Sequence, residues 1–191
     1  MIRAVLITSL LLSLFAQDKP AERTKASDYP AHTSLQGLEI GAESLVHSIP
    51  GDSGYYYADD YLVVDVGVFP SSGEGVRIAN RQFVLSINHG KRVYAPDSPG
   101  TVAASINPRA SRGFAGQQGQ DQQQDPNGAQ NGPPKTTYQT VVQAALPEGS
   151  TQKPAKGCLF FHIGGRMKSI RSIELIYDPG EGKPPVTIPL L

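Results

Sequence analysis

Apolar and polar residues alternate along much of this chain, and the alternation predicts a fold built from short β-strands. The clearest case is residues 61–69, YLVVDVGVF, where every second residue from Leu62 to Val68 is apolar. Further strands are predicted at 38–49, 81–87, 92–94, 101–106, 136–146, 158–163, 170–177 and 186–190. Beyond the first sixteen residues, helical spacing of apolar residues never lasts more than one turn, so any helices should be single turns.

Turn-forming sequences separate these strands, as at residues 70–75 (PSSGEG) and 88–91 (NHGK). Many short strands joined by turns of this kind predict an all-β fold, an antiparallel β-sandwich of about 7–9 strands. The sandwich domain is expected to span residues 38–190.

Two segments fall outside the strand pattern. Residues 17–37 are polar and carry two prolines, which predicts a flexible leader. Residues 107–135 are expected to form a long disordered loop within the domain, because 109–135 hold 7 Gln, 5 Gly and 3 Pro. Ordering that stretch would cost on the order of 27–54 kcal/mol, whereas burying Phe114, its one large apolar side chain, returns roughly 3 kcal/mol.

The first sixteen residues have the layout of a secretory signal peptide. Arg3 supplies a positive start, residues 4–15 are an uncharged and mostly apolar run, and Ala16 offers a small residue before a polar stretch. That run would span only about 18 Å as a helix, which is short of the ~30 Å hydrocarbon core of a membrane. The expectation is a secreted or periplasmic protein, with no stable membrane span after cleavage.

The charge balance argues against nucleic acid as a partner. Lys and Arg number 17, Asp and Glu also number 17, and no basic cluster is visible in the sequence. The single cysteine, Cys158, excludes a disulfide within the chain. Its flanks read as a strand, so Cys158 is interpreted as a small, half-buried apolar residue, with a reactive or intermolecular thiol as the alternative.

Sequence motifs that would indicate catalysis lack the other residues that the chemistry requires. Residues 51–54 (GDSG) resemble the sequence around the serine of chymotrypsin-like proteases, but the required His and Asp do not precede Ser53 at that family's spacing. The four histidines are widely separated and show no metal-binding spacing. We therefore expect no enzyme activity, no cofactor and no metal site. The alternative to the last of these is a cation bound by acidic loop residues such as Asp59 and Asp60.

A run of tyrosines is the most distinctive candidate for an interaction surface. Tyr55, Tyr56 and Tyr57 are consecutive, and Tyr61 follows. Consecutive residues of a strand or loop must expose at least one ring, and tyrosine is favoured at interfaces. These four residues are either a binding patch for a protein or glycan, or a half-buried edge of the sandwich.

Four segments together resemble the bacterial extracytoplasmic immunoglobulin-like domains of unknown function that occur in lipoproteins and secreted antigens. They are residues 61–69 (YLVVDVGVF), 83–98 (FVLSINHGKRVYAPDS), 157–163 (GCLFFHI) and 172–177 (SIELIY). The resemblance implies an immunoglobulin-like β-sandwich displayed outside the cytoplasm, and it brings no catalytic residues. The chain differs from that pattern by lacking a lipidation cysteine and by its long insertion.

Two functions remain open from the sequence. The first is an exported, non-catalytic module that works by surface contact with an unknown protein, a glycan or another envelope component. The second is a ligand- or cation-binding accessory domain of the cell envelope. Fold alone does not choose between them, because sandwiches carry many unrelated functions.

Overall fold

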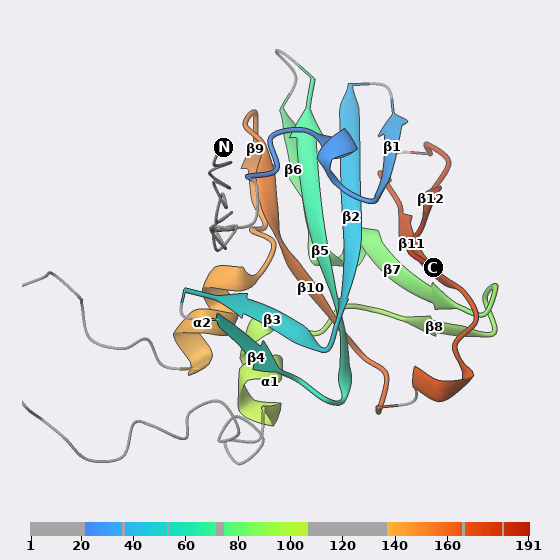
Figure 1. The fold of residues 1–191 in the computed structure, drawn as a ribbon. Coiled ribbons are helices and arrows are strands. Elements are labelled where there is room, and N and C mark those ends of the chain that lie inside the picture. The colour runs from blue at the N-terminus through green and yellow to red at the C-terminus, as the bar shows by residue number, and fades with distance from the viewer. Residues whose placement is uncertain are drawn as a thin grey trace, which may run out of the picture.

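The computed structural model describes residues 22–35, 37–52, 54–71, 75–106, 137–165, 167–180 and 182–191. The predicted signal peptide at 1–16 and the predicted disordered loop at 107–135 lie outside these residues. The described part is mostly β, with several antiparallel sheets and two short α-helices (Figure 1).

The first main sheet contains the strongest predicted strand at its centre. Its strands, in the order in which they are hydrogen-bonded, are β1 (Ala31–Leu35), β2 (Leu38–Val46), β5 (Tyr61–Pro70) and β10 (Ala155–His162). Neighbouring strands are antiparallel throughout, and a β-bulge near Val46 shifts the register between β2 and β5.

The second main sheet is formed mainly by the later part of the chain. Its strands, again in hydrogen-bonded order, are β12 (Val186–Pro189), β11 (Ile173–Tyr177), β7 (Phe83–Ile87) and β8 (Arg92–Tyr94). The turn from β7 to β8 places Asn88 and His89 at positive φ before Gly90, as a tight hairpin requires.

The main hydrophobic core lies between these two sheets. Alternate residues of β2, β5 and β10 meet alternate residues of β7 and β11, as the period-two pattern predicts. Phe83, Leu85 and Ile87 are fully buried, and so is Phe161 on the facing sheet. Two antiparallel sheets packed face to face are therefore confirmed as the centre of the fold.

The strand order differs from that of a constant-type immunoglobulin domain. In such a domain the second and third strands lie in opposite sheets. Here β2 and β5, the second and third strands of the main sheets, are hydrogen-bonded neighbours in one sheet. The connection between them, a two-stranded hairpin of β3 (Ser48–Gly51) and β4 (Gly54–Tyr57), returns the chain to the same sheet.

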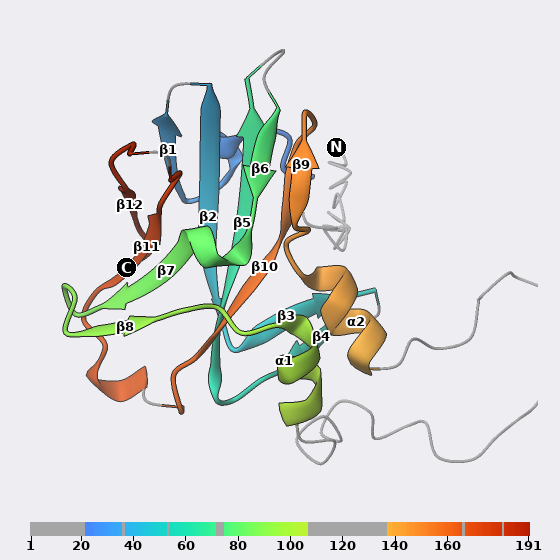
Figure 2. The same ribbon diagram turned by 180° about the vertical axis from the view of Figure 1, so that it is seen from behind.

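A third layer covers the other face of the first sheet. It contains the β3–β4 hairpin, α1 (Pro99–Ser105) and α2 (Thr137–Ala144), which lie together in both views (Figures 1 and 2). Buried residues of this layer, such as Val102 and Val141, pack against Val63 and Phe160 of the sheet. Because β5 is covered on both faces, nearly every residue in it is buried.

Two strand predictions and the expectation of single-turn helices are wrong. Residues 101–106 belong largely to α1, and residues 136–146 contain α2. The Ser98 side chain accepts a hydrogen bond from the Thr101 amide, and Pro99 occupies the first helical position. A capping serine followed by proline is typical of a helix start, which the strand-like composition of residues 101–106 obscured. In α2, burial of Val141 against the sheet overrides the β propensity of threonine and valine.

The expected flexible leader at 17–37 also contains ordered structure. A 3₁₀ helix, η1 (Ala26–Asp28), precedes β1, and the Tyr29 ring between them is buried. The ring lies over Gly41 and Gly67, which face each other across β2 and β5. Because neither glycine has a side chain, the sheet has room there for the Tyr29 ring. The segment that carries Tyr29 is therefore part of the fold.

The remaining elements lie around the ends of the sandwich. Strands β6 (Val76–Ile78) and β9 (Gly149–Thr151), far apart in the sequence, pair antiparallel in a second two-stranded sheet. Two further 3₁₀ helices are η2 (Asn80–Gln82), which leads into β7, and η4 (Met167–Ser169), which precedes β11.

Candidate functional site: a pocket at one end of the sandwich

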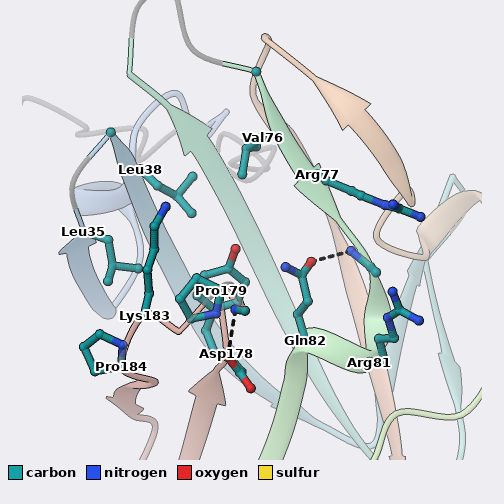
Figure 3. A pocket seen from close by; sticks show the side chains of 15 residues that line it. Leu35, Leu38, Val76, Arg77, Arg81, Gln82, Asp178, Pro179, Lys183 and Pro184 are labelled. Carbon is teal, nitrogen blue, oxygen red and sulfur yellow. Dashed lines mark hydrogen bonds between the residues drawn. The ribbon is translucent and has the colours of Figure 1, made fainter.

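A pocket opens where the two main sheets separate at one end. Its volume is ≈ 880 Å³, within the range usual for small-molecule sites. The walls come from the turn between β1 and β2, from β6 and η2, and from the loop that joins β11 to β12 (Figure 3). Segments about a hundred residues apart in the sequence therefore meet around one cavity.

Gln82 connects two of these walls. Its side-chain oxygen accepts a hydrogen bond from the Ala79 amide at 2.7 Å, which fixes the turn after β6 (Figure 3). Its backbone carbonyl accepts a hydrogen bond from the Asp178 amide, also at 2.7 Å, and so holds the β11–β12 loop in place. The pocket is thus supported by hydrogen bonds between elements that each belong to the fold.

The β11–β12 loop has its own internal bonds. The carboxylate of Asp178 accepts a hydrogen bond from the Gly180 amide at 2.8 Å, a local turn that aspartate favours. Gly180 has a φ of 73°, in the left-handed region that glycine adopts without strain, and its carbonyl accepts from the Lys183 amide at 3.1 Å. These bonds set the path of the loop along the pocket.

The lining changes from buried and apolar at the floor to exposed and polar at the mouth. Leu38 and Tyr177, at the floor, are buried members of the main core. Half-buried apolar residues, Leu35 and Val76 among them, form the walls and pack against the same core. The floor of the pocket is therefore the open end of the hydrophobic core.

Three cations and one carboxylate belong to the exposed residues along the edge of the pocket. Lys183 and Asp178 lie on the β11–β12 loop, whereas the side chains of Arg77 and Arg81 extend from β6 and η2 away from the cavity (Figure 3). Within the described residues, none of the three cationic side chains forms a salt bridge or a side-chain hydrogen bond. Burial, and next the nearby Asp178 charge, raise the pKa of Tyr177, so its hydroxyl stays neutral at the pocket floor.

The structure does not bring the four predicted tyrosines into one patch. Tyr55 and Tyr57 are exposed by 55% and 42%, because alternate residues of β4 point to the solvent side. Tyr56 points the other way and packs against the buried cluster between the third layer and the first sheet. Tyr61 is buried, with its hydroxyl donating to an Asp97 carboxylate oxygen at 3.1 Å. The exposed part of the candidate surface is therefore the pair Tyr55 and Tyr57.

The other chemistry-bearing residues are separated in the fold. Asp59 and Asp60 are exposed at the turn before β5, and the part of the chain that the structure describes contains no cluster of three potential metal ligands. Asp65, close to them in sequence, instead forms a salt bridge with Arg23 at 2.7 Å. Burial raises the pKa of Asp65, and the Arg23 charge opposes that shift.

Cys158 lies in a strand, β10, as its flanks predicted, but it is fully buried and not half-buried. Burial raises the pKa of its thiol well above the ordinary value, so the thiolate that nucleophilic chemistry needs is suppressed. The interpretation of Cys158 as an inert strand residue is consistent with this environment.

The pocket residues could not be recognised as a set from the sequence. Arg77 and Arg81 lie about a hundred residues before Lys183, and no motif links them. The only local signal is that each cation adjoins a segment rich in turn-forming or irregular structure, where binding residues are common.

The comparisons with known proteins place the chain near one solved structure. No family model matches the chain, and no curated protein matches it. The crystal structure of a "putative lipoprotein" (ycdA) from Bacillus subtilis is similar, with 14% identity and a TM-score of 0.42. The alignment covers 82% of this chain and 37% of that one, so the chain spans little more than a third of that protein's length. At this level of likeness no function is transferred.

Within the described residues, none of the helices is long and apolar enough to cross a membrane.

Proposed function

We propose that this protein is an exported, non-catalytic binding module that holds a small ligand in the pocket at the end of its sandwich. The observation that supports this most strongly is the pocket itself, ≈ 880 Å³ in volume, whose apolar floor continues the core and whose edge carries the exposed Asp178 and Lys183. A concave, mostly apolar site with a few polar groups at its edge is the usual form of a ligand site.

Two parts of this proposal, that the protein is exported and that it is not an enzyme, rest on the sequence. The first sixteen residues have the three parts of a signal peptide, and this layout supports a secreted or periplasmic location. The spacing of serine, histidine and acidic residues offers no nucleophile–base pair, which supports a binding function over a reaction.

The fold is proposed to be a variant of the immunoglobulin-like sandwich. Two facing sheets of four antiparallel strands each support this assignment. Many extracellular sandwich domains share this architecture without sharing the immunoglobulin strand order.

Surface contact through the β3–β4 hairpin is the second candidate. Tyr55 and Tyr57 point outward from a hairpin that packs on α2, so their rings are presented on a braced surface. Rigid, amphipathic rings of this kind are favoured at protein interfaces.

The pocket is tested with Nile red, a neutral apolar dye whose emission rises in apolar surroundings. Wild-type protein should bind the dye, and Val76→Asp should weaken binding about tenfold, because a carboxylate would enter the apolar wall. Val93→Asp is the matched control, since Val93 is 60% exposed on β8 and does not line the pocket.

Far-UV circular dichroism and thermal melting establish that each variant is folded. Pro184→Asp, at an exposed position of the pocket, serves as the second variant in case Val76→Asp does not fold. The proposal fails if folded pocket variants bind the dye as wild type does, or if Val93→Asp loses binding equally.

A further inference from the structure

We infer that the ligand of this pocket is a neutral, mainly apolar molecule that carries a hydrogen-bond acceptor oxygen. The carbonyl of a ketone, an ester or an amide is an oxygen of this kind, and the Gln82 side chain is the group that donates to it. The inference rests on the proposed function and names the chemical class of the ligand. It depends on how the Gln82 amide is held in the wall of the pocket.

The orientation of the Gln82 amide is fixed by its bond to the backbone. A backbone N–H can only donate, so the side-chain atom that lies 2.7 Å from the Ala79 nitrogen is the acceptor Oε1. Because Oε1 is turned toward Ala79, the Nε2 of the same amide is turned away from it. Figure 3 shows this nitrogen on the side of Gln82 that faces the cavity.

The Gln82 amide can donate to a ligand without losing its contacts in the protein. An amide NH₂ group carries two hydrogens. Gln82 and Tyr177 both line the cavity, and a hydrogen bond between the Gln82 side chain and the Tyr177 hydroxyl opposes the rise in the pKa of Tyr177 that burial causes. That contact uses at most one of the two hydrogens, so the other is available to an acceptor in the cavity.

The rest of the inner lining selects for an apolar body. Leu38 at the floor is exposed by 6%, and the half-buried Val76 and Leu35 continue the wall above it. Each CH₂ group that is fully buried against such a lining should strengthen binding about fourfold. An acceptor oxygen on an otherwise apolar molecule therefore matches both the lining and the Gln82 amide.

The charges along the edge favour a neutral ligand over an ionic one. Lys183 and Asp178 lie on the same loop and carry opposite charges, and the Asp178 carboxylate accepts a hydrogen bond from the Gly180 amide at 2.8 Å. Arg77 and Arg81 extend away from the cavity (Figure 3). An ionic group that entered the cavity would lose its hydration and meet no net opposite charge there.

The test compares acetophenone with α-methylstyrene, each as a competitor of Nile red. These two neutral molecules have nearly the same shape, because a C=O group in the first is replaced by a C=CH₂ group in the second. The affinity of each protein for Nile red is measured first, so that displacement gives the affinity for each competitor. The quantity compared among proteins is the affinity for acetophenone divided by the affinity for α-methylstyrene.

The variant Gln82→Glu removes the donor and keeps the acceptor. One carboxylate oxygen can still accept the Ala79 amide, while the other replaces Nε2 and cannot donate to a carbonyl. We expect the ratio of affinities to fall about tenfold in this variant, the loss of one hydrogen bond. Gln143→Glu makes the same chemical change at an exposed position of α2 outside this pocket, and it should leave the ratio unchanged.

A measurement on wild-type protein keeps the test decisive if Gln82→Glu does not fold. The side-chain NH₂ resonances of Gln82 in ¹⁵N-labelled protein should shift when acetophenone is added and shift much less with α-methylstyrene. Unmoved Gln82 resonances at saturating acetophenone would overturn the inference.

Three further results would also overturn it. The first is an unchanged ratio in folded Gln82→Glu, although Nile red binding that Val76→Asp weakens would still support the pocket. The second is a ratio that falls in Lys183→Met and not in Gln82→Glu, which would place the acceptor oxygen at the exposed edge. The third is the failure of both compounds to displace Nile red, which would exclude this class of ligand.

Discussion

Replacement of Gly67 by alanine tests how the N-terminal segment is held on the sheet. A Cβ atom at Gly67 would lie 2.7 Å from the Tyr29 hydroxyl and 2.8 Å from Tyr29 Cε2. Ordinary contact begins at 3.4 Å, so the Tyr29 ring would have to retreat by about 0.7 Å (3.4 minus 2.7). The Phe69 ring, 2.6 Å from the same position, would have to move as well.

These rings have little room to move. Tyr29 and Phe69 are exposed by 3% and 7%, and their rings meet in a T-shaped arrangement with the centroids 6.2 Å apart. The Arg23 guanidinium lies over the Tyr29 ring at 4.3 Å. Overpacking of this kind costs about 1–3 kcal/mol, which we expect as the loss in the free energy of unfolding of Gly67→Ala.

The same substitution should behave differently once the Tyr29 ring is removed. Gly67 has no left-handed φ, and alanine is favoured over glycine inside a strand by roughly 0.5–1 kcal/mol. In a Tyr29→Ala background the Phe69 ring can move into the vacated space, so Gly67→Ala should cost clearly less than it does in wild type. Guanidinium unfolding followed by far-UV circular dichroism measures all four proteins of this double-mutant cycle. An equal cost of Gly67→Ala in both backgrounds would refute the placement of the ring over Gly67.

Three further predictions concern other groups of the fold. Burial raises the pKa of Tyr29 to about 12, so the folded state disfavours its ionisation. Wild type should therefore lose about 2 kcal/mol of stability relative to Tyr29→Phe as pH rises from 10 to 12. Guanidinium unfolding across this range measures the difference, and a constant difference would contradict the prediction. The buried Cys158 thiol should resist Ellman's reagent in native protein and react once guanidinium unfolds the chain, whereas rapid native reaction would show an accessible thiol. Replacement of the exposed Tyr55 and Tyr57 by serine should change the free energy of unfolding by less than about 1 kcal/mol in total, and a larger loss in urea unfolding would show that the rings contribute to the core.

The parts of the fold that depend on period-two patterns were predictable from the sequence. Phe83, Leu85 and Ile87 share a face in the sequence and share the core in the structure. The pattern succeeds there because each residue of a strand alternates between two faces whatever its neighbours are. It could not indicate that the second face of β5 is covered as well, since the covering layer comes from distant segments.

The parts that depend on tertiary contacts were missed. α2 is only two turns long, so its helical pattern was too short to oppose its β-prone composition. Tyr29 was assigned to a flexible leader because nothing near it in sequence indicates that Gly41 and Gly67 face each other on the sheet. The pocket was missed for the same reason, because its rim is assembled from two segments that only the fold brings together.

Locating the bound dye on the protein tests the proposed pocket most directly. Nile red would be titrated into ¹⁵N-labelled protein while the backbone amide resonances are followed by NMR. We expect the largest shifts at residues 76–82 and 177–180, with little change at Tyr55 and Tyr57. Saturable shifts confined to the β3–β4 hairpin, with the pocket resonances unmoved, would contradict the proposal.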